Sequence, residues 1–212
     1  AQAFRDCKNL ENISIPKSVI SIGKGAFDGC DIKNVYIKDL TAYISCQYGD
    51  ASSVPHSQGV QGVNVYLNNE LIENLEIPNG VETIADSLFY GWTNLKSVKM
   101  SESVTNIGAQ AFERCSNLKN VELNDGLTRL KASTFEACGS LSSIVIPEGI
   151  VSIGSYAFDY CKNLKNITIP KTVTVIDKYA FRYCNNLEDV FYNGSEDDWN
   201  KVYIADGNDA LT

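Results

Sequence analysis

The chain has 212 residues, 44% of them hydrophobic, and its 26 acidic residues exceed its 18 basic residues to give a net charge of −8. This length can bury a substantial core, and the acidic balance argues against nucleic acid or an anionic membrane as the main partner. No stretch approaches the roughly 18 apolar residues that span a bilayer, so we expect no membrane insertion. Residues 1–7 repeat the pattern of residues 109–115, which predicts that the chain begins within a repeat and that any targeting segment lies upstream.

A phenylalanine recurs with a period of 23 residues, and a cysteine follows it three positions later in six of seven cases. The phenylalanines are Phe4, Phe27, Phe89, Phe112, Phe135, Phe158 and Phe181, and the cysteines are Cys7, Cys30, Cys115, Cys138, Cys161 and Cys184, with Trp92 at the remaining position. A fixed period of about 20 to 50 residues is the signature of stacked repeats. The sequence therefore predicts a repeat solenoid, one array over residues 1–212, and such arrays seldom carry catalytic pockets.

The first stretch, residues 1–37, consists of standard repeats, whose parts are clearest in the unit at residues 138–161. Leu141, Ile144 and Ile146 form a stretch that alternates in its second half, as a half-buried strand does. A proline ends the strand, and an Ile-x-x-Ile-Gly step follows, which we expect to be a short extended piece or turn on the opposite side. The Ala-Phe pair then turns inward, and stacking of strands about 4.8 Å apart predicts a parallel sheet on one face.

Residues 38–70 interrupt the period, because the second and third phenylalanines are 62 residues apart where two periods require 46. We predict a variant unit here, with a short helix that turns the aromatic ring of Tyr43 inward. A hairpin should close the unit, with positive φ at Asn68 and Asn69 in its turn. The Ser- and Gly-rich loop at residues 47–62 is predicted to be the most mobile part of the chain.

Standard 23-residue repeats resume over residues 71–192, and the tail at residues 193–212 begins a second variant unit that we expect to be truncated. The tail echoes the first variant unit, with Trp199 as its inward aromatic. Ser195 and Asp198 are spaced as a capping box at the start of a short helix. Glu196 and Asp197 suit the same helix N-terminus.

The recurring pattern Ile-Pro-x-x-Val-x-x-Ile-Gly-x-x-Ala-Phe-x-x-Cys-x-x-Leu resembles the BspA-like leucine-rich repeat, the subclass also found in treponemal surface proteins. The resemblance covers residues 1–37 and 71–192. It implies a right-handed superhelix with a parallel β-sheet on the concave face and short turns or helices on the other side. It also implies a secreted or surface-displayed protein, mostly of host-associated bacteria, that adheres to host proteins, to cells or to other microbes and has no catalytic residues to carry over.

The shared position of six cysteines raises disulfides or a metal site as alternatives. Trp92 shows that an apolar residue suffices at this position, and no Cys-x-x-Cys pair is present to hold a metal. We therefore expect buried free thiols that pack as small hydrophobic groups with a weak donor, and neither a metal nor a cofactor.

Cys46 and His56 are the one candidate nucleophile pair. No third group is evident to orient them, and His56 falls in the loop predicted to be mobile. No Walker, zincin or nucleophile-elbow motif is present. The sequence therefore predicts a protein that is not an enzyme.

Two columns of outward residues remain as candidates for function. The residues before each inward Val or Ile are mostly small and polar, which favours a structural ladder of side-chain hydrogen bonds along the stack: Asn12, Asn34, Asn74, Ser97, Asn120, Ser143, Asn166 and Asp189. The next outward column varies far more, and we predict that it binds a partner: Ser14, Tyr36, Glu76, Lys99, Glu122, Val145, Thr168 and Phe191. Among these, Tyr36, Val145 and Phe191 would be apolar anchors.

These observations predict a non-enzymatic, surface-exposed or secreted repeat module. Its concave strand face would mediate protein–protein or cell-adhesion contacts, with a protein or a glycan on a host or microbial surface as the partner. One alternative is a structural spacer that presents other modules of a larger surface protein. Another is a glycan-binding array that uses tyrosine and tryptophan platforms.

Overall fold

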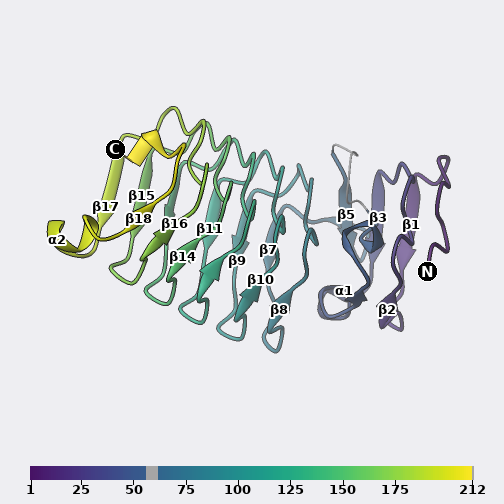
Figure 1. Ribbon diagram of the computed structural model, residues 1–212. Helices are drawn as coiled ribbons and strands as arrows, with labels where there is room; N and C mark the ends of the chain where they lie inside the picture. The colour runs from purple at the N-terminus through teal and green to yellow at the C-terminus, as the bar shows by residue number, and fades with distance from the viewer. Residues whose placement is uncertain (56–61, 212) are drawn as a thin grey trace.

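The computed structural model describes residues 1–55 and 62–211. Its coils stack into one elongated solenoid, with the two termini at opposite ends of the stack (Figure 1). The solenoid predicted from the 23-residue period is therefore confirmed, whereas the division into standard and variant units stays a prediction. No helix in the described part of the chain is long and apolar enough to cross a membrane.

The longer strands of successive coils pair side by side along one side of the stack. Every pairing is parallel except that of the hairpin strands β5 and β6. The three sheets contain β1 (Asn12–Ile15), β3 (Asn34–Ile37), β5 (Asn64–Leu67) and β6 (Glu70–Leu71); β7 (Asn74–Glu76), β9 (Ser97–Lys99) and β11 (Asn120–Glu122); and β13 (Ser143–Val145), β15 (Asn166–Ile169) and β17 (Asp189–Tyr192). Because the strands pair in register, equivalent positions of successive repeats lie next to one another.

Shorter strands form a second set of parallel ladders on another side of each coil. In the standard repeats they arise at the position of the Ile-x-x-Ile-Gly step, which is therefore extended, as one of its two predicted forms, whereas β4 and β18 lie in segments without this step. The strands are β2 (Ser21–Ile22) with β4 (Gln47–Tyr48), β8 (Thr83–Ile84) with β10 (Asn106–Ile107), and β12 (Arg129–Leu130), β14 (Ser152–Ile153), β16 (Val175–Ile176) and β18 (Tyr203–Ile204).

The third side of each coil is the Ala-Phe turn, where backbone hydrogen bonds again link neighbouring coils. The residues two before and two after each repeat phenylalanine have positive φ, and most are not glycine, as with Arg114 (61°), Ala137 (58°) and Tyr160 (59°). A left-handed conformation costs such residues about 1–2 kcal/mol each. Their N–H groups donate to the next coil, for example Ala137 to the Asp159 carbonyl at 2.7 Å, so the stack holds the conformation in place. In the described residues the standard repeats have turns and no helix on this side.

The phenylalanines form a spine inside the stack that is interrupted between Phe27 and Phe89. Ring centroids of Phe112 and Phe135 are 5.5 Å apart, those of Phe135 and Phe158 are 5.6 Å apart, and all three rings are fully buried. The predicted shared core of phenylalanines is therefore confirmed. Phe4 stacks on Phe27 and is 43% exposed.

The predicted variant unit, residues 38–70, contributes another buried aromatic residue where the phenylalanine spine is interrupted. Helix α1 (Leu40–Ile44) is capped by Asp39, whose carboxylate accepts the Ala42 N–H at 2.9 Å, and the helix buries Tyr43 as predicted. The ring of Tyr43 lies 6.4 Å from that of Trp92. The hairpin turn is also as predicted, with φ of 52° at Asn68 and 72° at Asn69.

Part of the segment predicted to be a mobile loop is packed on the stack. In residues 47–55, β4 pairs with β2, and the 3-10 helix η1 (Ala51–Ser53) buries the hydroxyl side chain of Ser53. The predictions for His56 and for the rest of residues 56–61 lie outside the described residues.

The tail forms helix α2 (Glu196–Trp199) and the 3-10 helix η2 (Asp209–Leu211). Ser195 accepts the Asp198 N–H at 3.1 Å, as predicted for the cap. In a capping box the Asp198 carboxylate would accept the Ser195 backbone N–H. Here it accepts the Ser195 hydroxyl instead, at 2.7 Å. Trp199 is only partly buried, and its ring centroid lies 5.1 Å from that of Tyr192.

Candidate binding surfaces

The residues of the outward column predicted to bind a partner lie in register on the long strands, and we call this surface the strand face. Register places Ser14 beside Tyr36 in the first sheet. In the second sheet Lys99 lies beside both Glu76 and Glu122, and in the third Thr168 lies beside both Val145 and Phe191. The predicted residues thus occur in three groups, each on its own sheet.

Each group has its own chemistry. The Tyr36 ring stacks on that of Tyr66, with centroids 4.9 Å apart and an interplanar angle of 14°. The second group is charged, and the Lys99 ammonium lies 3.5 Å from the Glu122 carboxylate, both largely exposed. The third group is apolar, with Val145 65% exposed and Phe191 54% exposed.

Tyr66 belongs to the strand face but is missing from the predicted column. The signal was present, because Asn64-Val65-Tyr66-Leu67 repeats Asn34-Val35-Tyr36-Ile37 almost residue for residue. The position of this stretch before the Asn68–Asn69 turn indicates an arm of the predicted hairpin, but β5 also pairs in parallel with β3.

The neighbouring polar column forms the predicted ladder over part of the stack. The Asn34 amide donates to the Asn12 side chain at 2.8 Å, the Asn64 amide donates to Asn34 at 3.0 Å, and the Ser97 hydroxyl donates to Asn74 at 2.7 Å. In the described residues the ladder does not continue over the C-terminal members of the column, from Asn120 onward. This column therefore has a structural role mainly at the N-terminal end.

The repeat cysteines are free thiols, and those of the central and C-terminal repeats are buried. Each of the buried repeat cysteines donates to the carbonyl of the phenylalanine in the preceding coil, as Cys138 does to Phe112 at 3.2 Å. Burial raises the pKa of Cys138 far above its usual value and that of Cys184 to about 12. Burial was wrongly predicted for Cys7 and Cys30, which lie in the first two coils and are exposed and half-buried respectively.

Cys46 is also buried, and burial raises the pKa of its thiol. A nucleophilic cysteine requires the opposite, a lowered pKa that populates the thiolate. Its environment therefore suits packing rather than covalent catalysis.

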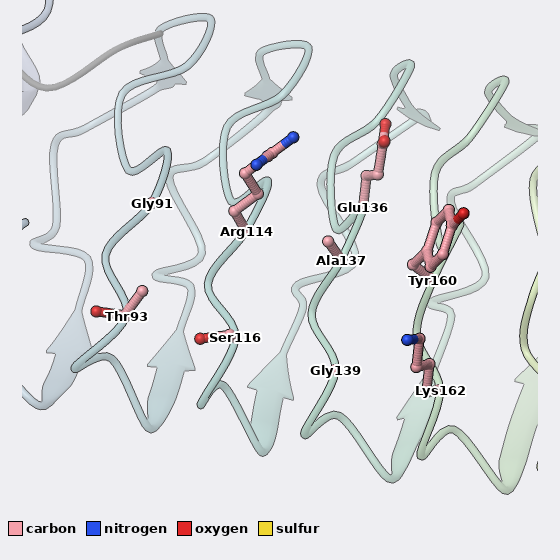
Figure 2. Close-up of a pocket in the computed structure, with 9 residues that line it drawn as sticks. All are labelled: Gly91, Thr93, Arg114, Ser116, Glu136, Ala137, Gly139, Tyr160 and Lys162. Atoms are coloured by element: carbon pink, nitrogen blue, oxygen red, sulfur yellow. The ribbon is translucent and has the colours of Figure 1, made fainter. Parts of the chain in front are cut away.

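A groove on another side of the stack was not predicted from the sequence. It lies where the chain runs from the Ala-Phe turns to the long strands, a side that we call the turn face, and it spans four successive coils (Figure 2). Gly91, Ala137 and Gly139 leave it open, Tyr160 lies at one end, and Arg114 lies between Gly91 and Ala137. Its volume is about 540 Å³.

Next to this groove, four tyrosines gather around one guanidinium group. The rings of Tyr156 and Tyr179 stack with centroids 5.3 Å apart, and those of Tyr160 and Tyr183 lie 4.5 Å apart. The guanidinium carbon of Arg182 is 5.0 to 6.0 Å from all four ring centroids, within cation–π range.

The buried carboxylate of Asp159 holds Arg182 in this position. Arg182 Nε donates to Asp159 Oδ1 at 3.1 Å and Nη2 donates to Oδ2 at 2.5 Å, a bidentate pair. These bonds raise the pKa of Arg182. A sequence signal existed for the cluster, since tyrosine occupies both left-handed positions in two successive repeats.

Parallel ladders built from a leucine-rich repeating unit define the class of protein as a leucine-rich-repeat solenoid. The model of the BspA type leucine rich repeat region matches six copies over residues 1–48 and 62–188. The chain belongs to this BspA-type leucine-rich repeat family. No match is found among the curated protein sequences.

Solved structures of bacterial proteins share the fold. A leucine rich cell surface protein from Faecalibacterium prausnitzii A2-165 is 27% identical with a TM-score of 0.73, over 96% of this chain and 65% of that protein's chain. A leucine-rich repeat protein from Eubacterium ventriosum is 18% identical with a TM-score of 0.62, over 92% and 63% of the two chains. The pneumococcal vaccine antigen PcpA is 19% identical with a TM-score of 0.62, over 89% and 46%. This chain therefore spans less than two thirds of the length of each.

Proposed function

We propose that this chain is a non-enzymatic module of a surface-displayed or secreted protein and that it binds a protein partner through the strand face. Membership of the leucine-rich repeat family supports a binding role. The likeness to a protein described as a leucine rich cell surface protein supports the location.

The observation that carries the proposal is the apolar group on the third sheet. Val145 and Phe191 are more than half exposed on strands of one sheet, with Thr168 between them in register. Apolar and aromatic side chains of this kind act as anchors when a partner removes them from water. Because paired strands hold them in place, little conformational entropy is lost on binding.

The charged group on the second sheet would add specificity to this anchor. The Lys99–Glu122 pair is exposed, so it contributes little to folding stability and can exchange its ion pair for one with a partner. A glycan partner on this face stays an alternative, as does a spacer role in which the face binds nothing.

The test is binding of the chain to an array of extracellular-matrix proteins, beside a variant with Tyr36, Lys99, Val145 and Phe191 changed to serine. We expect saturable binding that the variant loses. The matched control changes Ile20, Val151 and Tyr203 to serine, because these apolar side chains are also exposed but lie outside the strand face. Equal loss in both variants, or no binding by the native chain, would contradict the proposal, and the second result would favour the spacer.

A further inference from the structure

The groove on the turn face exists because two positions that carry large side chains in the next repeat carry small residues here. The left-handed position after the repeat phenylalanine holds tyrosine at Tyr160 and Tyr183 but alanine at Ala137. Gly139 occupies the position where the next repeat has Lys162, and a Cβ at Gly139 would meet no atom within 4 Å. The groove therefore lies in a gap between larger side chains of a regular column, and a rigid ladder forms its floor.

Backbone groups of this floor are already paired along the stack. The N–H groups of Gly91, Arg114 and Ala137 donate to carbonyls of the next coil at 2.8, 2.7 and 2.7 Å. A peptide could not add to this surface as a further strand, because that requires unpaired backbone groups. Proline-rich peptides bind between several aromatic rings, whereas Tyr160 is the one aromatic ring that lines the groove in the described residues.

Side chains supply the polar groups of the groove, and they include both donors and acceptors. The hydroxyls of Thr93 and Ser116, the Lys162 ammonium and the Glu136 carboxylate all line it. Within the described part of the chain, none of these four polar ends makes a hydrogen bond or ion pair to another protein group, and the Lys162 ammonium lies 5.5 Å from the centroid of the Tyr160 ring. A hydroxyl accepts and donates, an ammonium donates and a carboxylate accepts, so a ligand rich in hydroxyl groups would be matched.

Tyr160 closes one end of the groove and is 39% exposed. Its position is fixed from behind, because its ring packs on Tyr183 and Arg182, and the buried Asp159 carboxylate fixes Arg182. Its ring can therefore offer an apolar surface to a ligand without a loss of side-chain freedom.

The local charges balance. Arg114 lies beside Glu113, with Nε 3.4 Å from the carboxylate, and Lys162 and Glu136 have opposite charges. This balance favours a neutral ligand over a strongly acidic one. The groove volume of about 540 Å³ falls within the roughly 300–1,000 Å³ of small-ligand sites.

We propose that the turn-face groove binds a short neutral carbohydrate chain, with one sugar ring against Tyr160 and its hydroxyls on Ser116, Thr93, Glu136 and Lys162. This site is separate from the strand face, so the proposal does not depend on the function proposed above.

The test uses the full chain and neutral trisaccharides of glucose, mannose, galactose and N-acetylglucosamine as probes, with trigalacturonate as the acidic comparison. Binding is followed by the amide NMR shifts of Ala137 and Gly139 and by calorimetry. We expect at least one neutral trisaccharide to shift both amides saturably. No shift with any of them, or a shift with trigalacturonate alone, would overturn the proposal.

Ala137→Tyr is the decisive variant, because it fills the groove with a side chain that the scaffold already holds in the same conformation at Tyr160 and Tyr183. We expect it to fold with an unchanged denaturation midpoint and to weaken trisaccharide binding by at least about tenfold. Tyr160→Ser should also weaken binding. The strand-face serine variant should bind the trisaccharide as the native chain does, and native-like binding by Ala137→Tyr would contradict the assignment.

Discussion

At the scale of single residues, the phenylalanine spine dominates the stability of the stack. Phe135 is fully buried between the rings of Phe112 and Phe158, at 5.5 and 5.6 Å. Removing its ring leaves a cavity that the regular neighbouring coils cannot easily fill. We expect Phe135→Ala to lower the free energy of unfolding by about 3–5 kcal/mol, measured by urea denaturation.

Phe4→Ala is the matched control for this variant, since Phe4 stacks on one neighbour and keeps 43% of its surface exposed. It should cost clearly less. Equal effects of the two substitutions would mean that the ends of the stack are as tightly packed as its centre.

The buried thiols make stability sensitive to alkaline pH. Burial raises the pKa of Cys184 from a usual value near 9.0 to about 12, and it raises the pKa of Cys138 and Cys161 as well. In the unfolded chain these thiols lose their protons near pH 9, whereas in the folded chain they do not. The contribution of these protonated thiols to the free energy of unfolding is therefore complete below pH 9. It falls as the pH rises above 9, by up to about 1.4 kcal/mol per pH unit for each thiol.

Urea denaturation between pH 7 and pH 11 checks this expectation. The variant Cys138→Ala should have a smaller fall in unfolding free energy above pH 9 than the native chain, although it is less stable at pH 7. The same slope in both proteins would show that the thiol is not protected from ionisation.

At the scale of elements, the inward residues were predictable and the turn face was not. Leu141, Ile144 and Phe158 meet the same neighbours in every coil, so their period in the sequence reports their place in the core directly. The left-handed turns carry no such signal. Tyrosine and arginine normally avoid positive φ, and hydrogen bonds between coils, rather than residue preference, impose it on Tyr160 and Arg114.

The groove escaped prediction for a related reason. Ala137 and Gly139 carry no functional group that would indicate a site. They open a groove only because the equivalent positions of the next repeat carry the larger Tyr160 and Lys162 side chains. The strand face was easier, because alternation along a strand fixes which residues point outward. Tyr66 was missed there because its strand was assigned to a hairpin alone.

The tail packs on the last standard coil through the pairing of β18 with β16 and through the side chain of Asn208. Asn208 is buried, its oxygen accepts the Phe181 N–H at 2.9 Å, and its amide donates to the carbonyls of Asp177 at 2.9 Å and Ala205 at 2.7 Å. Asn208→Ala leaves a buried N–H without a partner. We expect a loss of about 1–3 kcal/mol in thermal or urea unfolding.

Asn185→Ala is the control for Asn208→Ala, because Asn185 is exposed on the same part of the stack. It should change stability by less than about 0.5 kcal/mol. A similarly small effect of Asn208→Ala would mean that the tail does not cap the array through this residue.

At the scale of the whole molecule, the stability of each coil depends on its position along the stack. Each coil contacts its immediate neighbours, so the free energy that protects a coil depends on how many neighbours it has. The sequence predicts this arrangement from the period alone. It does not predict where the array is weakest, because that depends on burial at the ends and at the variant unit.

Amide hydrogen exchange tests this distribution at two equivalent positions. The Phe4 N–H donates to the Ala26 carbonyl at 2.8 Å, and the Phe135 N–H donates to the Ala157 carbonyl at the same distance. The two bonds match, but Phe4 lies in a coil with one neighbour and Phe135 in a coil with two. If coils open from the ends, the Phe4 amide should exchange more than about a hundredfold faster, a difference of about 2.8 kcal/mol in opening free energy. Equal protection at the two amides would mean instead that the array unfolds as one cooperative unit, and that the rigid display of the strand face extends to its first coil.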